Sequence, residues 1–124
     1  MSRSIIQKYK DECFVCGEKR NLEEHHIFQG SNRSLSEHYG LKVMLCHRCH
    51  NEPPEGAHFN NALRRELHAV GQLAFEKKYG HEKFMHEFGR DYIEAGLEEG
   101  HLKRNFTGLL GEYGILRKWQ RENG

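Results

Sequence analysis

The sequence lacks any apolar run that approaches the roughly 20 residues needed to cross a bilayer. Its first residues, MSRSIIQKYKDE, also lack the apolar centre of a secretion signal. Only 36% of the 124 residues are hydrophobic, and the mean hydropathy is -0.88. We therefore expect a cytoplasmic protein with a small apolar core, which a bound metal or disulfides would help to hold together.

An excess of charge of one sign is also absent, because 19 Lys and Arg residues stand against 18 Asp and Glu residues, a formal net charge of +1. Bulk charge therefore does not indicate nucleic-acid binding, and any binding face must be a local concentration of Lys and Arg. Histidine, by contrast, is abundant, with ten residues. Their number calls for a chemical explanation.

Cysteine is scarce, and its spacing is informative. The four cysteines form two pairs, Cys13-x-x-Cys16 and Cys46-x-x-Cys49. In a reducing compartment such pairs favour metal ligation over disulfides, and together they supply the four thiolates of a tetrahedral structural zinc site. Redox pairs and unliganded thiols are the alternatives. We predict one structural zinc ion per chain, with no open coordination position.

The first half of the chain is predicted to contain short elements separated by turns. Residues 1–10 suggest a short helix or an arm, and glycines punctuate residues 11–52 in the manner of turns between short strands. The best strand candidate is LKVML, residues 41–45, because alternate residues place Leu41, Val43 and Leu45 on one face. The tandem prolines of NEPPEG, residues 51–56, predict a break.

Two amphipathic helices are predicted beyond the break. Apolar residues recur at helical spacing in the first helix, which we expect to end at Tyr79 with Gly80 just beyond it. Its stripe consists of Phe59, Leu63, Leu67, Val70 and Ala74, and the second helix presents Phe84, Phe88 and Tyr92. We interpret both stripes as core. Residues 1–92 are thus predicted as the folded domain, and residues 93–124 as a basic, glycine-containing tail, either helical or irregular.

The stretch between the two cysteine pairs is longer than the roughly 15 to 20 residues of a plain zinc ribbon. It contains EEHHI at 23–27, and the second pair lies in LCHRCHN at 45–51. With Cys13 and Cys16, these residues resemble the HNH nucleases of the ββα-metal fold, in the variant with two CxxC knuckles. The sequence is also similar to small phage-encoded HNH proteins, which implies a phage or prophage origin. The resemblance covers residues 13 to about 92.

The resemblance implies an α+β fold with a small ββα-metal core, clamped by the zinc site and followed by two or three helices. It implies that His25 is a ligand of a catalytic divalent cation, Mg or another, and that His26 is the general base. Histidine suits that role because its unperturbed pKa of about 6.5 lies near working pH. His50 is the expected opposing ligand, and His58 an additional or replacement ligand.

The sequence departs from the family pattern at two places. No Asn stands in YGLKVML, where the middle Asn of the motif is expected, and Asn32 is the candidate substitute. Pro53 and Pro54 interrupt the family helix, which is why His58 competes with His50. A plainer interpretation is that His25 and His26 are only exposed or hydrogen-bonded residues of a hairpin.

The implied function is a metal-dependent endonuclease that hydrolyses phosphodiester bonds of DNA, with double-stranded DNA as the expected substrate. Basic residues near the motif are candidate phosphate contacts, although such residues often serve solubility alone. They are Arg33, Lys42, Arg48, Arg64 and Arg65. The alternative is a non-catalytic zinc module that binds nucleic acid or a protein partner.

The remaining histidines are expected at the surface or in local hydrogen bonds; they are His38, His47, His68, His81, His86 and His101. Glu23 and Glu24 look like solvated charges, although either could hydrogen-bond a metal-binding histidine.

Overall fold

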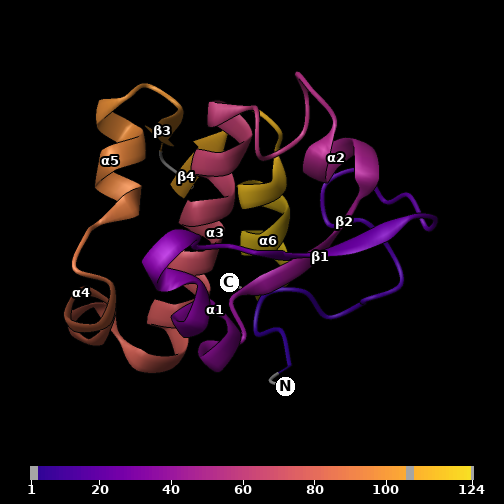
Figure 1. Ribbon diagram of the computed structural model, residues 1–124. Helices are drawn as coiled ribbons and strands as arrows, with labels where there is room; N and C mark the ends of the chain where they lie inside the picture. Colours follow the sequence, from indigo (N-terminus) through magenta and orange to yellow (C-terminus); the bar gives the residue numbers. More distant parts are fainter. Residues whose placement is uncertain (1–2, 106–107, 124) are drawn as a thin grey trace.

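The computed structural model describes residues 3–105 and 108–123, which form an α+β fold (Figure 1). In chain order the elements are β1 (Leu22–His26), the 3-10 turn η1 (Gly30–Asn32), α1 (Arg33–Tyr39), β2 (Lys42–Cys46), α2 (His47–Asn51), α3 (Asn61–Tyr79), α4 (His81–Phe88), α5 (Tyr92–Glu98), β3 (Leu102–Asn105), β4 (Gly108–Gly111) and α6 (Ile115–Asn123). None of the helices in these two ranges has the length and hydrophobicity to span a membrane.

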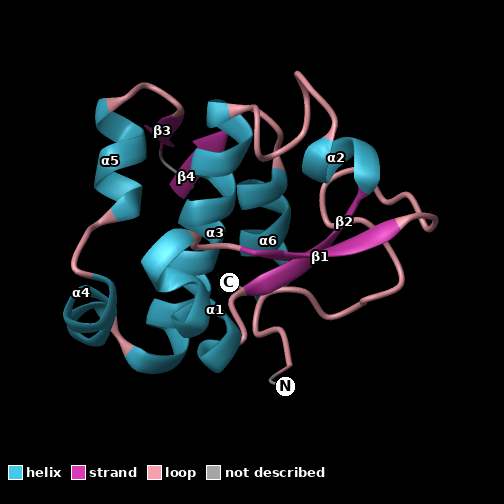
Figure 2. Ribbon diagram, in the orientation of Figure 1, coloured by secondary structure: helices cyan, strands magenta, loops and turns pink. Residues whose placement is uncertain are grey.

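The hairpin of β1 and β2 lies on one side of the central helix α3, and α4 and α5 lie on the other (Figure 2). The strands are antiparallel, with Leu22 opposite Cys46 and His26 opposite Lys42. The predicted strand at 41–45 is confirmed with a shift of one residue, since Leu41, Val43 and Leu45 are all buried on one face.

Helix α1 joins the two strands and was not predicted, because it carries no apolar stripe. It is held instead by a polar contact: the buried Ser36 hydroxyl donates to the carbonyl of Phe28 and accepts from the amide of Phe28, both at 3.0 Å. Gly40 ends the helix in a left-handed conformation that suits glycine. A Cβ atom at Gly40 would also overlap the backbone of Arg3.

Helix α3 ends at Tyr79 as predicted, but it begins later than its stripe suggested. The Asn60 side chain caps it by accepting from the amide of Leu63 at 3.1 Å. Phe59 therefore lies outside the helix and is 57% exposed. His58, the residue before Phe59, likewise stands in the loop before the cap.

The predicted second helix is divided in two. Gly89 ends α4 in a left-handed conformation, and the carboxylate of Asp91 starts α5 by accepting from the amides of Ile93 and Glu94. Tyr92 thus opens the next helix. The predicted aromatic stripe still meets in the core, because the ring of Phe28 lies 4.8 Å from Phe88 and 4.7 Å from Tyr92.

The described residues 93–105 and 108–123 belong to the same fold and not to a separate tail. Their apolar side chains join the single buried core, and they are Ile93, Leu102, Leu109, Ile115, Leu116 and Trp119. Glu66 of α3 is fully buried, and its carboxylate accepts from the amides of Tyr113 at 2.9 Å and Leu116 at 3.1 Å. Burial raises the pKa of Glu66, and these amides stabilise its charged form. Glu66 of α3 therefore caps the N-terminus of α6.

Leu116→Ala should destabilise the whole protein if α6 belongs to its core. Leu116 is fully buried, and truncating such a leucine costs about 2 to 5 kcal/mol through lost burial and the cavity that remains. Urea unfolding followed by circular dichroism measures the loss. The neighbouring exposed Arg117→Ala is the control and should change the unfolding free energy by no more than about 0.5 kcal/mol. Equal stability of the two variants would contradict the packing.

Candidate metal centre and histidine cluster

The two cysteine pairs meet at the open end of the hairpin. The first lies in a turn before β1, where the amide of Gly17 donates to the carbonyl of Cys13 at 2.9 Å and Gly17 has a φ of 83°. The second spans the junction of β2 and α2, with Cys46 as the residue that begins the helix. All four Sγ atoms lie within 4.8 Å of one another, so the predicted cysteine cluster is confirmed as a possible metal site.

The distances suit a metal better than a disulfide. Sγ of Cys16 lies 3.6 Å from Sγ of Cys46, whereas a disulfide needs about 2.05 Å. Tetrahedral thiolates around an ion with metal–sulfur bonds of about 2.3 Å are separated by roughly 3.8 Å. The donor set therefore fits a tetrahedral ion, and the cluster alone does not say which one.

The thiols differ in how easily they ionise. Burial opposes ionisation of Cys16, but hydrogen bonds from the Glu18 backbone and the neighbouring thiols lower its pKa to about 7. Burial raises the pKa of Cys49, and the charge of Cys13 adds to this effect. Four adjacent thiolates repel one another, so the fully ionised cluster needs a cation.

Three histidines converge beside α2. Ring nitrogens of His25, His50 and His58 lie within 4.8 Å of one another. The ring centroids are 5.1 Å apart for His25 and His50, and 4.7 Å apart for His50 and His58. His58 is exposed, so the cluster is open to solvent on that side. The two candidate second ligands are therefore both present.

His25 is the unusual member of this cluster. It is 2% exposed, and neither of its ring nitrogens has a hydrogen-bond partner among the described residues. Burial, followed by the charges of His50 and His58, lowers the pKa of His25 to about 3. A buried imidazole without partners is costly, and a cation held between neutral imidazoles would satisfy it. The residues therefore fit a divalent ion.

Backbone contacts to α2 bring His58 to the cluster. The amide of Ala57 donates to the carbonyl of Cys49 at 2.7 Å, and the amide of His58 donates to the carbonyl of His50 at 3.2 Å. The proline-containing loop thus turns back over the short helix. Because Cys49 belongs to that helix, the cysteine cluster and the histidine cluster share one support.

Glu23 orients the residues around His50. Its carboxylate accepts from Nδ1 of His50 at 2.8 Å, Nδ1 of His47 at 3.0 Å and the side-chain amide of Asn51 at 3.0 Å. The contact with His50 is the main reason that the pKa of Glu23 is lowered. A carboxylate on Nδ1 leaves Nε2 as the nitrogen with a free lone pair. Glu23 therefore directs Nε2 of His50 at the cluster.

His26 lies on the opposite face of β1, as strand alternation requires. Its Nε2 lies 3.0 Å from Oε1 of Glu37 and 3.9 Å from Glu24. Oε2 of Glu37 also accepts from the ammonium of Lys42 at 2.8 Å. The sequence offered no signal for Glu37, because its helix was not foreseen. The three residues Glu24, His26 and Glu37 form a further group with metal-binding atom types.

Asn32 is not brought to the histidines. Its side-chain amide donates to the hydroxyl of Tyr92 at 3.4 Å, and it forms no hydrogen bond with His25, His26 or His50. Asn32 ends η1 and precedes α1, so it does not stand in the stretch at the start of β2 where the motif would need an Asn. The structure therefore corrects its predicted place in the site.

The five candidate phosphate contacts divide into two groups. Arg33 and Arg48 are exposed, with Arg48 in a surface ion pair with Glu55 at 3.7 Å, and Arg64 is half-buried beside the carbonyl of His58. Lys42, by contrast, is buried and paired with Glu37 and Glu24, and Arg65 is paired with Glu99 at 2.7 Å. The charges of these last two are therefore already paired with carboxylates, and phosphate contact by any of the five stays a prediction.

His68 was expected at the surface or in a local hydrogen bond; it is buried, and its Nδ1 lies 3.5 Å from the guanidinium of Arg65, which is a local hydrogen bond. Its ring stacks on Phe28 at 5.2 Å and meets the edge of Tyr92 at 4.8 Å. Burial, followed by the charges of Arg65, Arg64 and Arg90, lowers its pKa to about 3. His68 is thus a neutral core residue behind the site.

Comparisons with known proteins do not identify the chain. A scan against protein-family models finds no match, and searches of curated proteins and of solved structures find none either. The function must therefore be argued from the site.

His68 should make the protein less stable as the pH falls. The ordinary pKa of 6.5 applies to the unfolded chain and about 3 to the folded one, so between these values unfolding takes up a proton. The contribution is up to about 1.4 kcal/mol per pH unit. Urea unfolding between pH 7.5 and 5 should show a shallower slope for His68→Phe than for the parent. Parallel slopes would contradict a buried neutral His68, and the exposed His38→Phe serves as control.

Proposed function

We propose that the protein is a metal-dependent endonuclease of the HNH type that hydrolyses phosphodiester bonds in DNA. The observation that supports this most is His25, which is buried without a hydrogen-bond partner where ring nitrogens of His50 and His58 converge. A hydrogen-bonded hairpin histidine would have a partner. The arrangement fits a cation site open to solvent on one side.

We also propose that the cysteine cluster holds zinc. Thiolate ligands select soft or borderline ions, and four of them leave no position for water or substrate. This ion is therefore structural. Its role is to fix α2, which carries His50, against the start of β1.

The second ion would be held by His25, His50 and His58, with Glu23 orienting His50. Magnesium prefers oxygen ligands, so an imidazole set favours a transition metal. When bound, the cation supplies a Lewis acid that offsets the negative charge of the attacked phosphate and the leaving oxygen. Three protein ligands leave coordination positions for substrate.

In its neutral form, His26 would take the proton of the attacking water. Glu37 accepts from Nε2 of His26, which would leave Nδ1 of His26 as the basic nitrogen. Carboxylates orient catalytic histidines in this way in other enzymes. We assign to Glu37 the orienting role for which Asn32 was the sequence candidate. Double-stranded DNA is the proposed substrate, with Arg33, Arg48 and Arg64 as phosphate contacts.

A second candidate function is a non-catalytic zinc module that binds nucleic acid or a protein. Two observations favour it: Asn32 bonds to Tyr92, and the ring of His26 is held by Glu37 on the face of β1 opposite His25. This candidate needs the cysteine cluster but no proton transfer at His26.

His26→Ala should abolish metal-dependent nicking of supercoiled plasmid. Removing a general base typically slows hydrolysis about 10² to 10⁴-fold. The assay compares parent and variant with magnesium, manganese or nickel at equal protein concentration. His38→Ala, an exposed histidine on α1, is the control and should retain full activity. Circular dichroism and zinc content should match the parent. Equal cleavage by parent and His26→Ala, or none by either, would favour the non-catalytic module.

The parent protein should retain one zinc ion per chain after dialysis, measured by elemental analysis. Cys46→Ser should lose it and be largely unfolded, because structural zinc contributes about 10 to 16 kcal/mol in small peptides and typical domain stability is about 5 to 15 kcal/mol. His25→Ala should keep the zinc, which separates the two clusters. If elemental analysis finds no zinc in parent protein purified without chelator, the assignment of zinc to the cysteine cluster is refuted.

A further inference from the structure

The N-terminal arm, residues 3–12, is bound along the edge of β2 that does not pair with β1. The Ser4 hydroxyl donates to the carbonyl of Lys42 at 2.6 Å, and the amide of Ile5 donates to the carbonyl of Gly40 at 2.9 Å. The side chain of Gln7 accepts from the amide of Met44 at 2.7 Å. These contacts fix the course of the arm, and the described part of it contains no helix.

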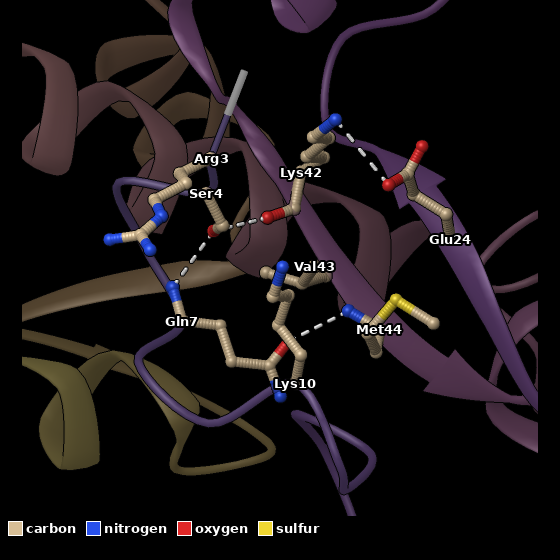
Figure 3. A pocket seen from close by; sticks show the side chains of 8 residues that line it. All are labelled: Arg3, Ser4, Gln7, Lys10, Glu24, Lys42, Val43 and Met44. Atoms are coloured by element: carbon tan, nitrogen blue, oxygen red, sulfur yellow. Dashed lines mark hydrogen bonds and ion pairs between the residues drawn. The ribbon is translucent and has the colours of Figure 1, made fainter. Parts of the chain in front are cut away.

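The arm and the hairpin enclose a pocket of about 270 Å³ (Figure 3). The arm contributes Arg3, Ser4, Gln7 and Lys10, and the hairpin contributes Glu24, Lys42, Val43 and Met44. We refer to it as the arm pocket. Neither the histidine cluster nor the cysteine cluster lines it, so it is a separate feature of the molecule.

The charges in the arm pocket are unevenly distributed. The ammonium of Lys42 is buried and lies 2.8 Å from Glu37 and 3.4 Å from Glu24. Arg3 and Lys10 are exposed, and neither has an acidic partner among the residues that the structure describes. Figure 3 shows Arg3 and Glu24 on opposite sides of the pocket. The uncompensated positive charge therefore lies on the arm side.

The polar groups of the arm are already used in holding it. Ser4 and Gln7 bond to the backbone of β2 and of the arm itself, so Arg3 and Lys10 are the free donors. A guanidinium pairs with phosphate through two parallel hydrogen bonds, and an ammonium adds a point charge. Met44 supplies an apolar surface on which a sugar can rest. This chemistry selects an anionic phosphate group.

We propose that the arm pocket binds a phosphate group of the nucleic acid strand, at a point separate from the bond that is cleaved. The inference rests on the proposed function, because it takes DNA as the ligand. The arm pocket is lined by Glu24, Lys42 and Met44, which lie on the same face of the hairpin as His26, whereas His25 lies on the other face. A strand that reaches His26 therefore passes the side of the hairpin on which Arg3 and Lys10 lie.

The test is the double variant Arg3→Gln/Lys10→Gln. Fluorescence anisotropy measures binding of a labelled DNA duplex over a range of salt concentrations, without added divalent cation so that no cleavage occurs. The variant should bind more weakly, and its slope of log K against log salt should be shallower by about 1 to 2. Unchanged affinity and slope would overturn the inference.

The matched control is Lys19→Gln/Lys103→Gln. Both lysines are exposed, lie outside the arm pocket, and give the same change in net charge. The inference requires this control to keep the affinity and slope of the parent. A loss equal to that of the arm variant would mean that only overall charge matters, and it would overturn the inference.

A titration with inorganic phosphate tests whether the pocket binds free phosphate or a phosphate group of nucleic acid. In the parent, phosphate titration followed by NMR should shift the backbone amide signals of Ser4, Gln7 and Met44 only weakly, and duplex DNA should shift them strongly. Phosphate shifts together with unchanged DNA binding by the arm variant would assign the pocket to free phosphate and overturn the nucleic-acid assignment. If the parent binds no DNA, both the inference and the proposed function fail. If the parent binds DNA and the arm variant binds it equally well, only the inference fails.

Discussion

The convergence of four sulfur atoms is the constraint on which the rest of the structure depends. Cys16 and Cys46 are 30 positions apart, yet their Sγ atoms lie 3.6 Å from each other. This contact closes the end of the β1–β2 hairpin and sets the direction in which α2 leaves β2. The direction of α2 places His50, and the carbonyl of His50 then holds His58. Neither strands of five residues nor a helix of five residues would be stable without such a constraint.

Buried polar side chains support the fold where apolar residues are few. Gln72 of α3 is 1% exposed, and its carbonyl oxygen accepts from the amide of Tyr92 at 2.8 Å while its amide group donates to Asp91 at 3.0 Å. Ser36 and Glu66 act in the same way on α1 and α6. Each satisfies backbone amides that would otherwise be unpaired at a helix start or in a loop. These contacts explain how a chain of low mean hydropathy builds six helices within the described ranges.

The sequence predicted the features that depend on local spacing. The cysteine pairs, the strand near residues 41–45 and the end of α3 each follow from a few neighbouring residues. It did not predict α1, which carries no apolar stripe, or the strands β3 and β4, which are only four residues long each. Glu37 illustrates the limit: nothing near it in sequence indicates that it meets His26. Phe59 fitted a helical stripe, but the cap at Asn60 excludes it from the helix.

The hydrogen-bond roles within the histidine cluster show why it suits a cation. Glu23 can only accept, so Nδ1 of neutral His50 carries its proton and Nε2 carries a lone pair. Nε2 of His58 lies 3.0 Å from that atom and donates to its lone pair. This pairing leaves His25 alone without a partner, and an unpaired buried polar group costs about 1 to 3 kcal/mol. A cation shared by all three rings would remove that cost once His58 shifts its proton to the other nitrogen. His25 is therefore the residue whose burial a cation bound by the three rings would compensate.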